Sequence, residues 1–321
     1  MTRRGAHAVP DLVARARAGE AAAVARLITL VEDASPHLRE VMAALNPHTG
    51  RAHVLGITGA PGVGKSTSTN ALVAGMRRAG KRVGVLAIDP SSPFSGGALL
   101  GDRVRMGDHA LDKDVYIRSM GARGHLGGLA WSTPQAVRVL DAAGCDVVVV
   151  ETVGVGQSEV EVAGLADTTL VLLAPGMGDG IQAAKAGILE VGDLYVVNKA
   201  DREGAERTRR ELRTMLSLGE RHEGAWRPPV LMTVASTGEG IDDLLGELER
   251  HVTWLEESGE LTRRRTLRAR REVEAIALAS LRERWGGTDG GDDLDVLAAR
   301  VAAGETDPYA AADRLLDRGG D

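Results

Sequence analysis

The amino-acid sequence predicts an α/β fold with a mostly parallel central sheet flanked by helices, and two features of its hydrophobic pattern predict it. Short runs rich in Val, Ile and Leu recur along the middle of the chain, as in strands that are covered on both faces. Longer stretches with helical spacing separate these runs, and this alternation favours a parallel sheet with right-handed crossovers. The expected strands are residues 53–58, 82–89, 114–120, 146–151, 168–174, 193–198 and 229–235.

The two ends of the chain have the periodicity of helices instead. Residues 1–50 are expected to form a helical N-terminal segment, which Asn46, Pro47 and Gly50 close. Residues 51–255 are expected to form the α/β domain, and residues 256–321 a helical C-terminal arm. The helices expected in that arm cover residues 262–285, 292–304 and 307–320.

Composition and charge exclude several classes of protein. The net charge of −6 argues against nucleic acid as the main partner, because binding phosphates requires a concentrated basic face. The arginine-rich run 263–271 is therefore interpreted as a solvated face or as a docking face for an acidic protein. A single cysteine, Cys145, rules out a disulfide framework within the chain. No apolar run approaches the length of a membrane span and no secretory signal is recognisable, so we expect a soluble cytoplasmic protein without a membrane partner.

A glycine-rich loop between the first strand and the following helix predicts a phosphate-binding site. The stretch from Gly59 to Ser66 fits G-x-x-x-x-G-K-[ST], the P-loop of P-loop NTPases. Its backbone N–H groups would surround the phosphates, Lys65 would reach the β- and γ-phosphates, and the Ser66 hydroxyl would bind Mg²⁺. The residues expected to contact the nucleotide here are Gly59, Ala60, Pro61, Gly62, Val63, Gly64, Lys65, Ser66 and Thr67.

A second motif indicates which base is bound. Asn198, Lys199 and Asp201 form N-K-x-D at the end of an expected strand. The Asp201 carboxylate would accept hydrogen bonds from the guanine N1–H and exocyclic amine, a bidentate pairing that adenine cannot make. Ala235, Ser236 and Thr237, in "VASTGEG", are placed to contact the same base from the next strand end. The sequence therefore predicts GTP or GDP as the nucleotide.

Carboxylates follow several strands and are candidate supports for the metal. Glu151 precedes Gly154 in "ETVG", where many GTPases have D-x-x-G, so Glu151 would support Mg²⁺ and the Gly154 N–H would sense the γ-phosphate. Asp89 and Asp102 compete for the same ion, although each could equally cap a helix or lie in solvent. Arg105 could meet the charge that develops on the phosphate, or form a surface salt bridge.

Together these motifs resemble those of the methylmalonyl-CoA mutase-associated GTPases of the MeaB type, which have also been described as ArgK or as transport kinases. The segments that carry the resemblance are "GITGAPGVGKST", "AIDPSSPFSGGALLGDRVRM", "RSMGARGHLGGL", "VVVVETVGVGQSEVEV" and "VVNKAD". The resemblance implies a homodimer that couples GTP hydrolysis to adenosylcobalamin loading and protection of an acyl-CoA mutase, most commonly methylmalonyl-CoA mutase. It does not separate that client from other acyl-CoA mutases.

The resemblance also implies roles for individual residues. It places Mg²⁺ near Ser66, Asp89, Asp102 and Glu151, and assigns Arg105 to the first switch loop. It matches a further switch loop to residues 176–187 of this chain. In that loop Asp179, Gln182 and Lys185 fall on polar positions, and Lys185 is a candidate catalytic residue or else a helix-surface lysine.

Three other functions compete with this hypothesis. A nickel or cobalt metallochaperone would need soft or imidazole ligands, whereas this chain has eight scattered His and one Cys. A kinase of a transport-binding protein would need a base aimed at an acceptor hydroxyl, and no segment clearly supplies one. An adaptor that binds nucleotide without hydrolysing it would not need the set of metal carboxylates. The C-terminal arm is expected to carry one apolar stripe that a second copy, or the chain's own core, would bury: Leu267, Val273, Ile276, Leu278, Leu281 and Trp285.

Overall fold

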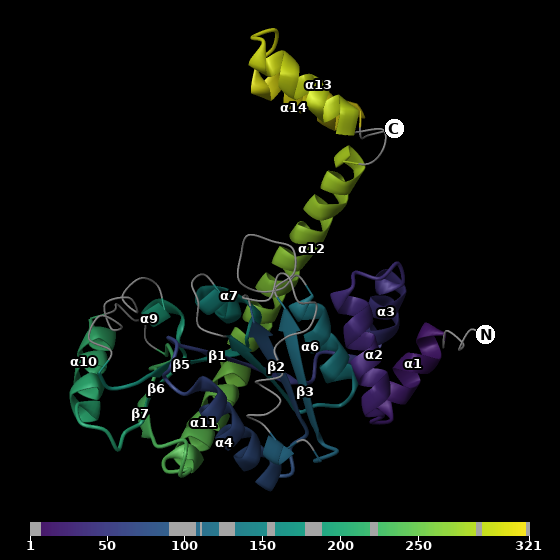
Figure 1. Cartoon of the computed structure of the whole chain (residues 1–321). Coiled ribbons are helices and arrows are strands. Elements are labelled where there is room, and N and C mark those ends of the chain that lie inside the picture. The colour runs from purple at the N-terminus through teal and green to yellow at the C-terminus, as the bar shows by residue number, and fades with distance from the viewer. Residues whose placement is uncertain are drawn as a thin grey trace. The chain divides into compact units, whose positions relative to one another are not determined.

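The computed structural model describes most of the chain, in two compact units (Figure 1). The described residues are 8–89, 107–109, 111–121, 132–152, 158–176, 188–218, 224–286 and 291–318. The first unit is Met1–Leu261 and the second is Thr262–Asp321. The last complete helix of the first unit is α11, Ile241–Glu257.

Within the described residues, the first unit is built on a fully parallel seven-stranded sheet, so the predicted fold class is confirmed. The strand order is β3-β2-β4-β1-β5-β6-β7. The strands are β1 His53–Thr58, β2 Val83–Asp89, β3 Val115–Gly121, β4 Val147–Thr152, β5 Thr168–Leu173, β6 Leu194–Asn198 and β7 Val230–Thr233. From β1 the chain runs outward to β2 and β3, returns to β4 between β1 and β2, and then continues on the other side of β1 through β5, β6 and β7. The direction in which strands are added therefore reverses beside β1, which makes this a topological switch point. Ligands of open α/β sheets bind at the carboxyl ends of strands at such a point.

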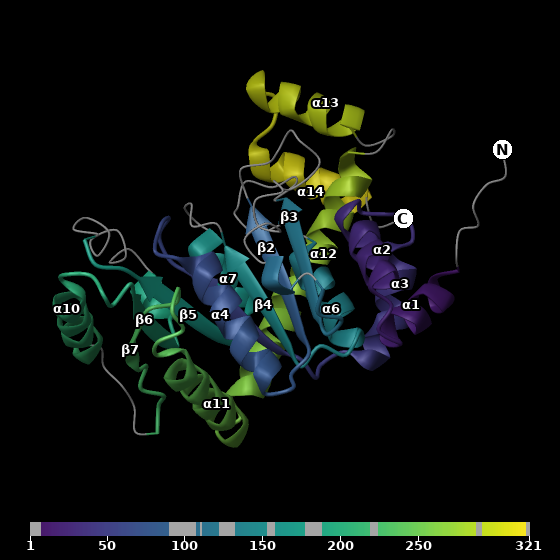
Figure 2. The same cartoon turned by 60° about the horizontal axis from the view of Figure 1, so that its bottom comes forward.

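Helices cover both faces of the sheet, which explains why the strands are almost continuously apolar. On one face, α4 (Lys65–Arg78) and α11 lie side by side and pack on Leu55 and Ile57 of β1 (Figure 2). Because side chains alternate along a strand, Val54 faces the other layer. That layer contains α1 Val9–Arg17, α2 Ala21–Glu32, α3 Leu38–Leu45, α6 Thr133–Ala142, α7 Ser158–Leu165, α9 Ile188–Val191 and α10 Ala205–Ser217.

Aspartates organise the amino edge of the sheet. Each one directly precedes a strand and accepts a hydrogen bond from a backbone N–H at the beginning of the neighbouring strand. The pairs are Asp146 with Arg82 at 2.7 Å, Asp167 with Val54 at 3.0 Å, and Asp193 with Thr169 at 2.8 Å. These carboxylates satisfy the backbone donors at the ends of the ladders and thereby help to fix the strand register.

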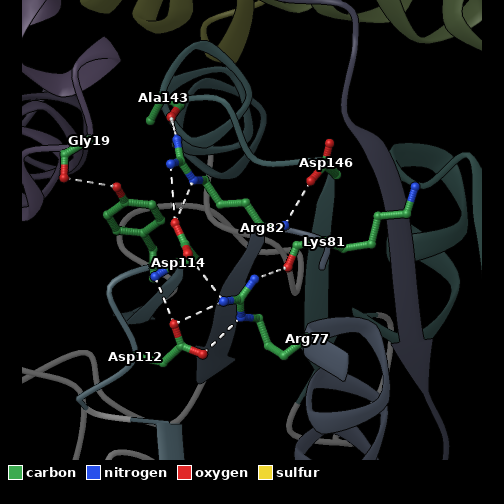
Figure 3. Close-up of polar contacts among 9 residues, drawn as sticks. Gly19, Arg77, Lys81, Arg82, Asp112, Asp114, Ala143 and Asp146 are labelled. Atoms are coloured by element: carbon green, nitrogen blue, oxygen red, sulfur yellow. Dashed lines mark hydrogen bonds and ion pairs between the residues drawn. The ribbon is translucent and has the colours of Figure 1, made fainter. Parts of the chain in front are cut away.

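Near the same edge, a network of arginines and aspartates ties the end of α4 to the beginning of β3 (Figure 3). Arg77 Nε donates to Asp112 Oδ2 at 2.8 Å and Arg77 Nη2 donates to Asp114 Oδ2 at 3.1 Å. Arg82 also donates to Asp114, through Nε and Nη2. The hydrogen bonds from Arg77 hold the pKa of Asp112 below its ordinary value.

Helices also form the first and last parts of the described chain, as predicted. The N-terminal helices are followed by a short 3₁₀ segment, Asn46–His48, and a second such turn covers Gly107–His109. The second unit contains all but the first two residues of α12 (Glu260–Gly286), together with α13 Gly291–Ala302 and α14 Pro308–Arg318. None of the helices that the structure describes is both long and apolar enough to cross a membrane.

The apolar residues of α12 do not form one stripe. At 3.6 residues per turn, Leu267, Leu278 and Leu281 share one side of the helix, and Val273 and Ile276 lie on the opposite side. Leu267, Val273, Ile276 and Leu278 are all exposed within this chain.

Candidate nucleotide site

The glycine-rich loop joins the end of β1 to the beginning of α4, at the carboxyl edge of the sheet. Gly59 and Gly64 have positive φ values of 142° and 96°. A Cβ atom on Gly59 would lie 2.3 Å from the Leu172 carbonyl oxygen, and one on Gly64 would lie 2.5 Å from Asn198 Nδ2. Only glycine fits either position without displacing its neighbours. The loop therefore brings its backbone close to the strand ends and opens α4 with a helix N-terminus that favours anions.

The first two residues of α4 contact the loop and β4. Lys65 is buried, and its Nζ donates to the carbonyl oxygens of Gly59 at 2.6 Å and Ala60 at 3.0 Å. Ser66 Oγ donates to Glu151 Oε1 at 2.6 Å, and Glu151 is buried in β4, one residue before its end. A hydroxyl and a carboxylate in contact are the oxygen donors that Mg²⁺ prefers, so this pair fits the expected ion.

The rest of the loop divides between core and surface. Val63 is fully buried in the core between the sheet and α4. Pro61, Gly62 and Thr67 are exposed. The loop is thus anchored at its middle by one aliphatic side chain, and solvent reaches it at Pro61, Gly62 and Thr67.

Asn198 connects the glycine-rich loop to the ends of β6 and β7. Its Nδ2 donates to the Val63 carbonyl oxygen at 2.8 Å. Its Oδ1 accepts from the Ala235 N–H at 3.1 Å and from Thr233 Oγ1 at 3.2 Å. With a side chain buried among these partners, Asn198 joins segments that lie far apart in the sequence.

Lys199 makes a second link between the same segments. It has a positive φ of 57°, which is unusual for a residue with a side chain, and its Nζ donates to the Gly62 carbonyl oxygen at 2.6 Å. This conformation turns the chain sharply after β6. Asp201, two residues later, is exposed and available to a ligand from solvent.

A small hairpin after β7 lies beside Asn198. The Val234 N–H donates to the Glu239 carbonyl oxygen at 3.0 Å, and the residues between them form the turn. Ala235 is buried through its contact with Asn198, whereas Ser236 and Thr237 are exposed at the tip. The structure thus brings the predicted base-reading residues to the same edge as the phosphate-binding loop.

Several predicted site residues cannot be placed. The residues outside the described part of the chain are Asp102, Arg105, Gly154, Asp179, Gln182 and Lys185. Asp89 ends β2, where Ile88 pairs with Thr152, so its backbone reaches the same edge as Glu151. Of the four predicted metal residues, the structure brings Ser66 and Glu151 into contact. Among the described residues, no three His, Cys, Asp or Glu side chains cluster as metal ligands would.

Sequence reasoning missed Thr233, the residue whose hydroxyl donates to Asn198. Thr233 is buried at the end of β7, and its carbonyl oxygen also accepts from the Ala200 N–H at 3.0 Å. The only signal was a hydroxyl residue at the end of an apolar strand, directly before the turn. Its partner could not be known before the pairing of β6 with β7 was established.

A family model and several relatives match this chain. The family model described as methylmalonyl-CoA mutase-associated GTPase MeaB matches residues 24–288. A protein of Pyrococcus abyssi that is named as a GTPase is 46% identical over 310 residues, covering 96% of each chain. A mouse protein, the mitochondrial homolog of methylmalonic aciduria type A, is 34% identical over 319 residues, 93% of this chain and 76% of the mouse protein.

A solved structure resembles the whole chain as well. The crystal structure of a LAO/AO transport system kinase is 28% identical, has a TM-score of 0.73 and covers 100% of both chains.

Proposed function

The chain belongs to the family of methylmalonyl-CoA mutase-associated GTPases of the MeaB type, and on that premise we propose that it gates adenosylcobalamin loading of an acyl-CoA mutase and protects that enzyme. Guanine nucleotide binding and GTP hydrolysis are properties of the family. The strongest structural support is for nucleotide binding: Asn198 and Lys199 of N-K-x-D are hydrogen-bonded to the phosphate loop. Through this link, the base and the phosphates of one nucleotide are held by a single connected structure.

The proposed binding of GTP follows from the positions of these side chains. The backbone N–H groups of the loop from Gly59 to Thr67, except at Pro61, which has none, surround the phosphates, and Lys65 neutralises charge on the β- and γ-phosphates. Asp201 selects guanine by accepting two hydrogen bonds from the base, and Lys199 lies along the base plane. Ala235, Ser236 and Thr237 close the base from the hairpin side.

Mg²⁺ would be held by Ser66 and Glu151, which already contact one another, with Asp89 and Asp102 as further supports. When bound, the ion would neutralise charge on the phosphate oxygens during hydrolysis. We assign Arg105 to the developing charge on the γ-phosphate, and the Gly154 N–H to sensing that phosphate. No glutamine follows Glu151 at the spacing of the water-orienting residue of other GTPases, so we expect slow turnover in the absence of a partner.

The coupling to the client requires loops that differ between the GTP-bound and GDP-bound states, because a ligand shifts an equilibrium only through differential contacts. We assign this role to residues 89–106 and to the loop 176–187, in which Lys185 responds to the client. We also propose that the C-terminal arm, residues 256–321, joins two copies as a homodimer. The exposed Leu267, Val273, Ile276 and Leu278 of α12 support this assembly, because a second copy would bury them.

A cofactor-transfer experiment tests the proposal. Purified acyl-CoA mutase is mixed with this protein and with adenosylcobalamin on its donor enzyme, and the transfer is followed by absorbance with GTP, with GDP and without nucleotide. We expect the rate or extent of transfer to depend on GTP, and Lys65→Ala to abolish that dependence. Transfer that is the same under all three conditions would contradict the chaperone role. Incorporation of labelled γ-phosphate into a transport-binding protein would favour the alternative, a kinase.

A further inference from the structure

The two edges of the central sheet differ in how they are protected. At one edge, β7 has only four residues and directly follows Pro228 and Pro229. Short strands and prolines both hinder the addition of another strand. At the other edge, β3 has seven residues and contains neither proline nor lysine, and it lies beside α2 (Figure 2). The β3 edge is therefore the one that is open to pairing with a further strand.

A cavity of about 430 Å³ lies between β3 and α2, a volume in the range of ligand-binding pockets. One wall is a single face of α2, formed by Ala21, Val24, Ala25 and Ile28, and the other is formed by the consecutive residues 115–118 of β3. Side chains of consecutive strand residues point to opposite faces of a sheet. A cavity that contacts four such residues in a row therefore lies against the outer edge of the strand, next to its backbone.

The backbone of β3 presents hydrogen-bonding groups to this edge. Along a strand in a parallel ladder, the residues that face a given neighbour alternate. The Asp114 carbonyl oxygen accepts from the Val83 N–H of β2 at 3.0 Å, so the even-numbered residues of β3 face β2. The N–H and C=O groups of Ile117 and Ser119 therefore point outward. No described residue forms a hydrogen bond with these groups.

Two buried side-chain atoms of β3, Arg118 Nε and Ser119 Oγ, also lack a hydrogen-bond partner in the described part of the chain. The other side of the Arg118 guanidinium is engaged by α2. Its Nη2 donates to Glu32, and to Thr29 Oγ1 at 3.3 Å. The ion pair balances the charge of Arg118, whereas the buried Nε still needs an acceptor. The cavity therefore favours an uncharged ligand that carries a hydrogen-bond acceptor.

An extended peptide matches these features, because every second residue of a strand presents an N–H and a C=O to the same side and its side chains alternate. We propose that β3 pairs with an extended, uncharged peptide segment of another protein, which adds an eighth strand to the sheet and places an apolar side chain in the cavity beside α2. The strands β2 and β4 separate this edge from β1 and the phosphate loop. The peptide and the nucleotide therefore bind at different places.

The first test is a selection for binding peptides. A library of short random peptides displayed on phage is selected on the immobilised full-length protein and, in parallel, on Ala25→Glu and Ala22→Glu. Both alanines are exposed on α2, but Ala25 lines the cavity and Ala22 does not, so Ala22→Glu is a matched control. We expect uncharged peptides with alternating apolar residues to be enriched on the parent and on Ala22→Glu, and not on Ala25→Glu. No enrichment on the parent, or equal enrichment on all three proteins, would refute the proposal.

The second test follows amide hydrogen exchange by NMR in the parent protein, with and without the most enriched peptide made synthetically. At saturating peptide, the amides of Ile117 and Ser119 should exchange at least about tenfold more slowly, because each gains a hydrogen bond. The amides of Tyr116 and Arg118 face β2 and should change little. Binding that leaves Ile117 and Ser119 unprotected would mean that the peptide fills the cavity without extending the sheet, and this would overturn the proposal.

The same measurement separates a partner peptide from a second copy of this chain. Without peptide, protection of Ile117 and Ser119 should not depend on protein concentration. Protection that rises with concentration would place a second copy at the β3 edge and would contradict the proposal. Both α2 variants should keep the parental rate of GTP turnover, which shows that a loss of peptide enrichment on Ala25→Glu does not come from unfolding.

Discussion

Asn198→Ala should separate the base-reading segment from the phosphate loop, and the structure gives the size of the effect. The side chain makes three hydrogen bonds, to the Val63 carbonyl oxygen, the Ala235 N–H and the Thr233 hydroxyl. Each such bond contributes about 1 kcal/mol net, so their loss should lower the free energy of unfolding by about 3 kcal/mol. Without the link, part of the binding free energy must be spent on holding the two segments in place. We expect this cost to be at least about 1.4 kcal/mol, which corresponds to a tenfold fall in GTP affinity.

Two milder substitutions make this prediction specific. Thr233→Val removes one of the three bonds and should cost about 1 kcal/mol. Thr214→Val, on the exposed side of α10, removes a local hydroxyl-to-carbonyl bond and should leave both stability and affinity unchanged. Stability is measured by urea unfolding without nucleotide, and affinity by titration with a fluorescent GDP analogue. If Asn198→Ala kept the parental stability and affinity, the link between the two segments would not be what holds the site together.

Three further predictions concern the base, the metal and the acid limit of stability. Asp201→Asn should weaken GTP binding by roughly 2–4 kcal/mol, because the amide presents a donor where guanine needs an acceptor. In a competition assay the variant should favour xanthine nucleotides. An unchanged preference for guanine would mean that Asp201 does not read the base. Glu151→Ala should retain much of the GTP binding but lower turnover in a phosphate-release assay, and parental turnover would remove Glu151 from the metal site. Asp112, whose pKa is lowered by Arg77, stabilises the fold above its unfolded pKa, and this contribution is lost as the pH falls. Asp112→Asn should therefore cost about 1 kcal/mol at pH 7 and less near pH 3 in urea unfolding, whereas an equal cost at both pH values would contradict an ionic role.

The strands could be predicted from sequence because the sheet is covered on both faces. Between its two ends, the run 146–151 does not alternate polar and apolar residues, as expected of a strand that is buried on both faces. The structure places β4 at Val147–Thr152. The same pattern cannot give the strand order. The aspartates before β4, β5 and β6 are visible in the sequence, but each acts on a neighbouring strand that only the topology identifies.

The candidate site divides in the same way. The residues of the P-loop and of N-K-x-D follow from local motifs, and the structure brings both motifs to one edge. The bond from Asn198 to Val63 joins residues 135 positions apart, and the support from Thr233 depends on the pairing of β6 with β7. On α12, hydrophobicity alone suggested one apolar stripe, whereas the helical period divides those residues between two sides.

GTP turnover measured with and without a purified adenosylcobalamin-dependent acyl-CoA mutase tests the central claim most directly. We expect slow phosphate release from this protein alone and a clear increase when its client mutase is added. Lys65→Ala should remove both rates, and Lys185→Ala should reduce the increase while GTP affinity stays nearly parental. If no acyl-CoA mutase from the same cell changes the rate of GTP turnover, the protein is a GTPase of this family that does not serve a mutase.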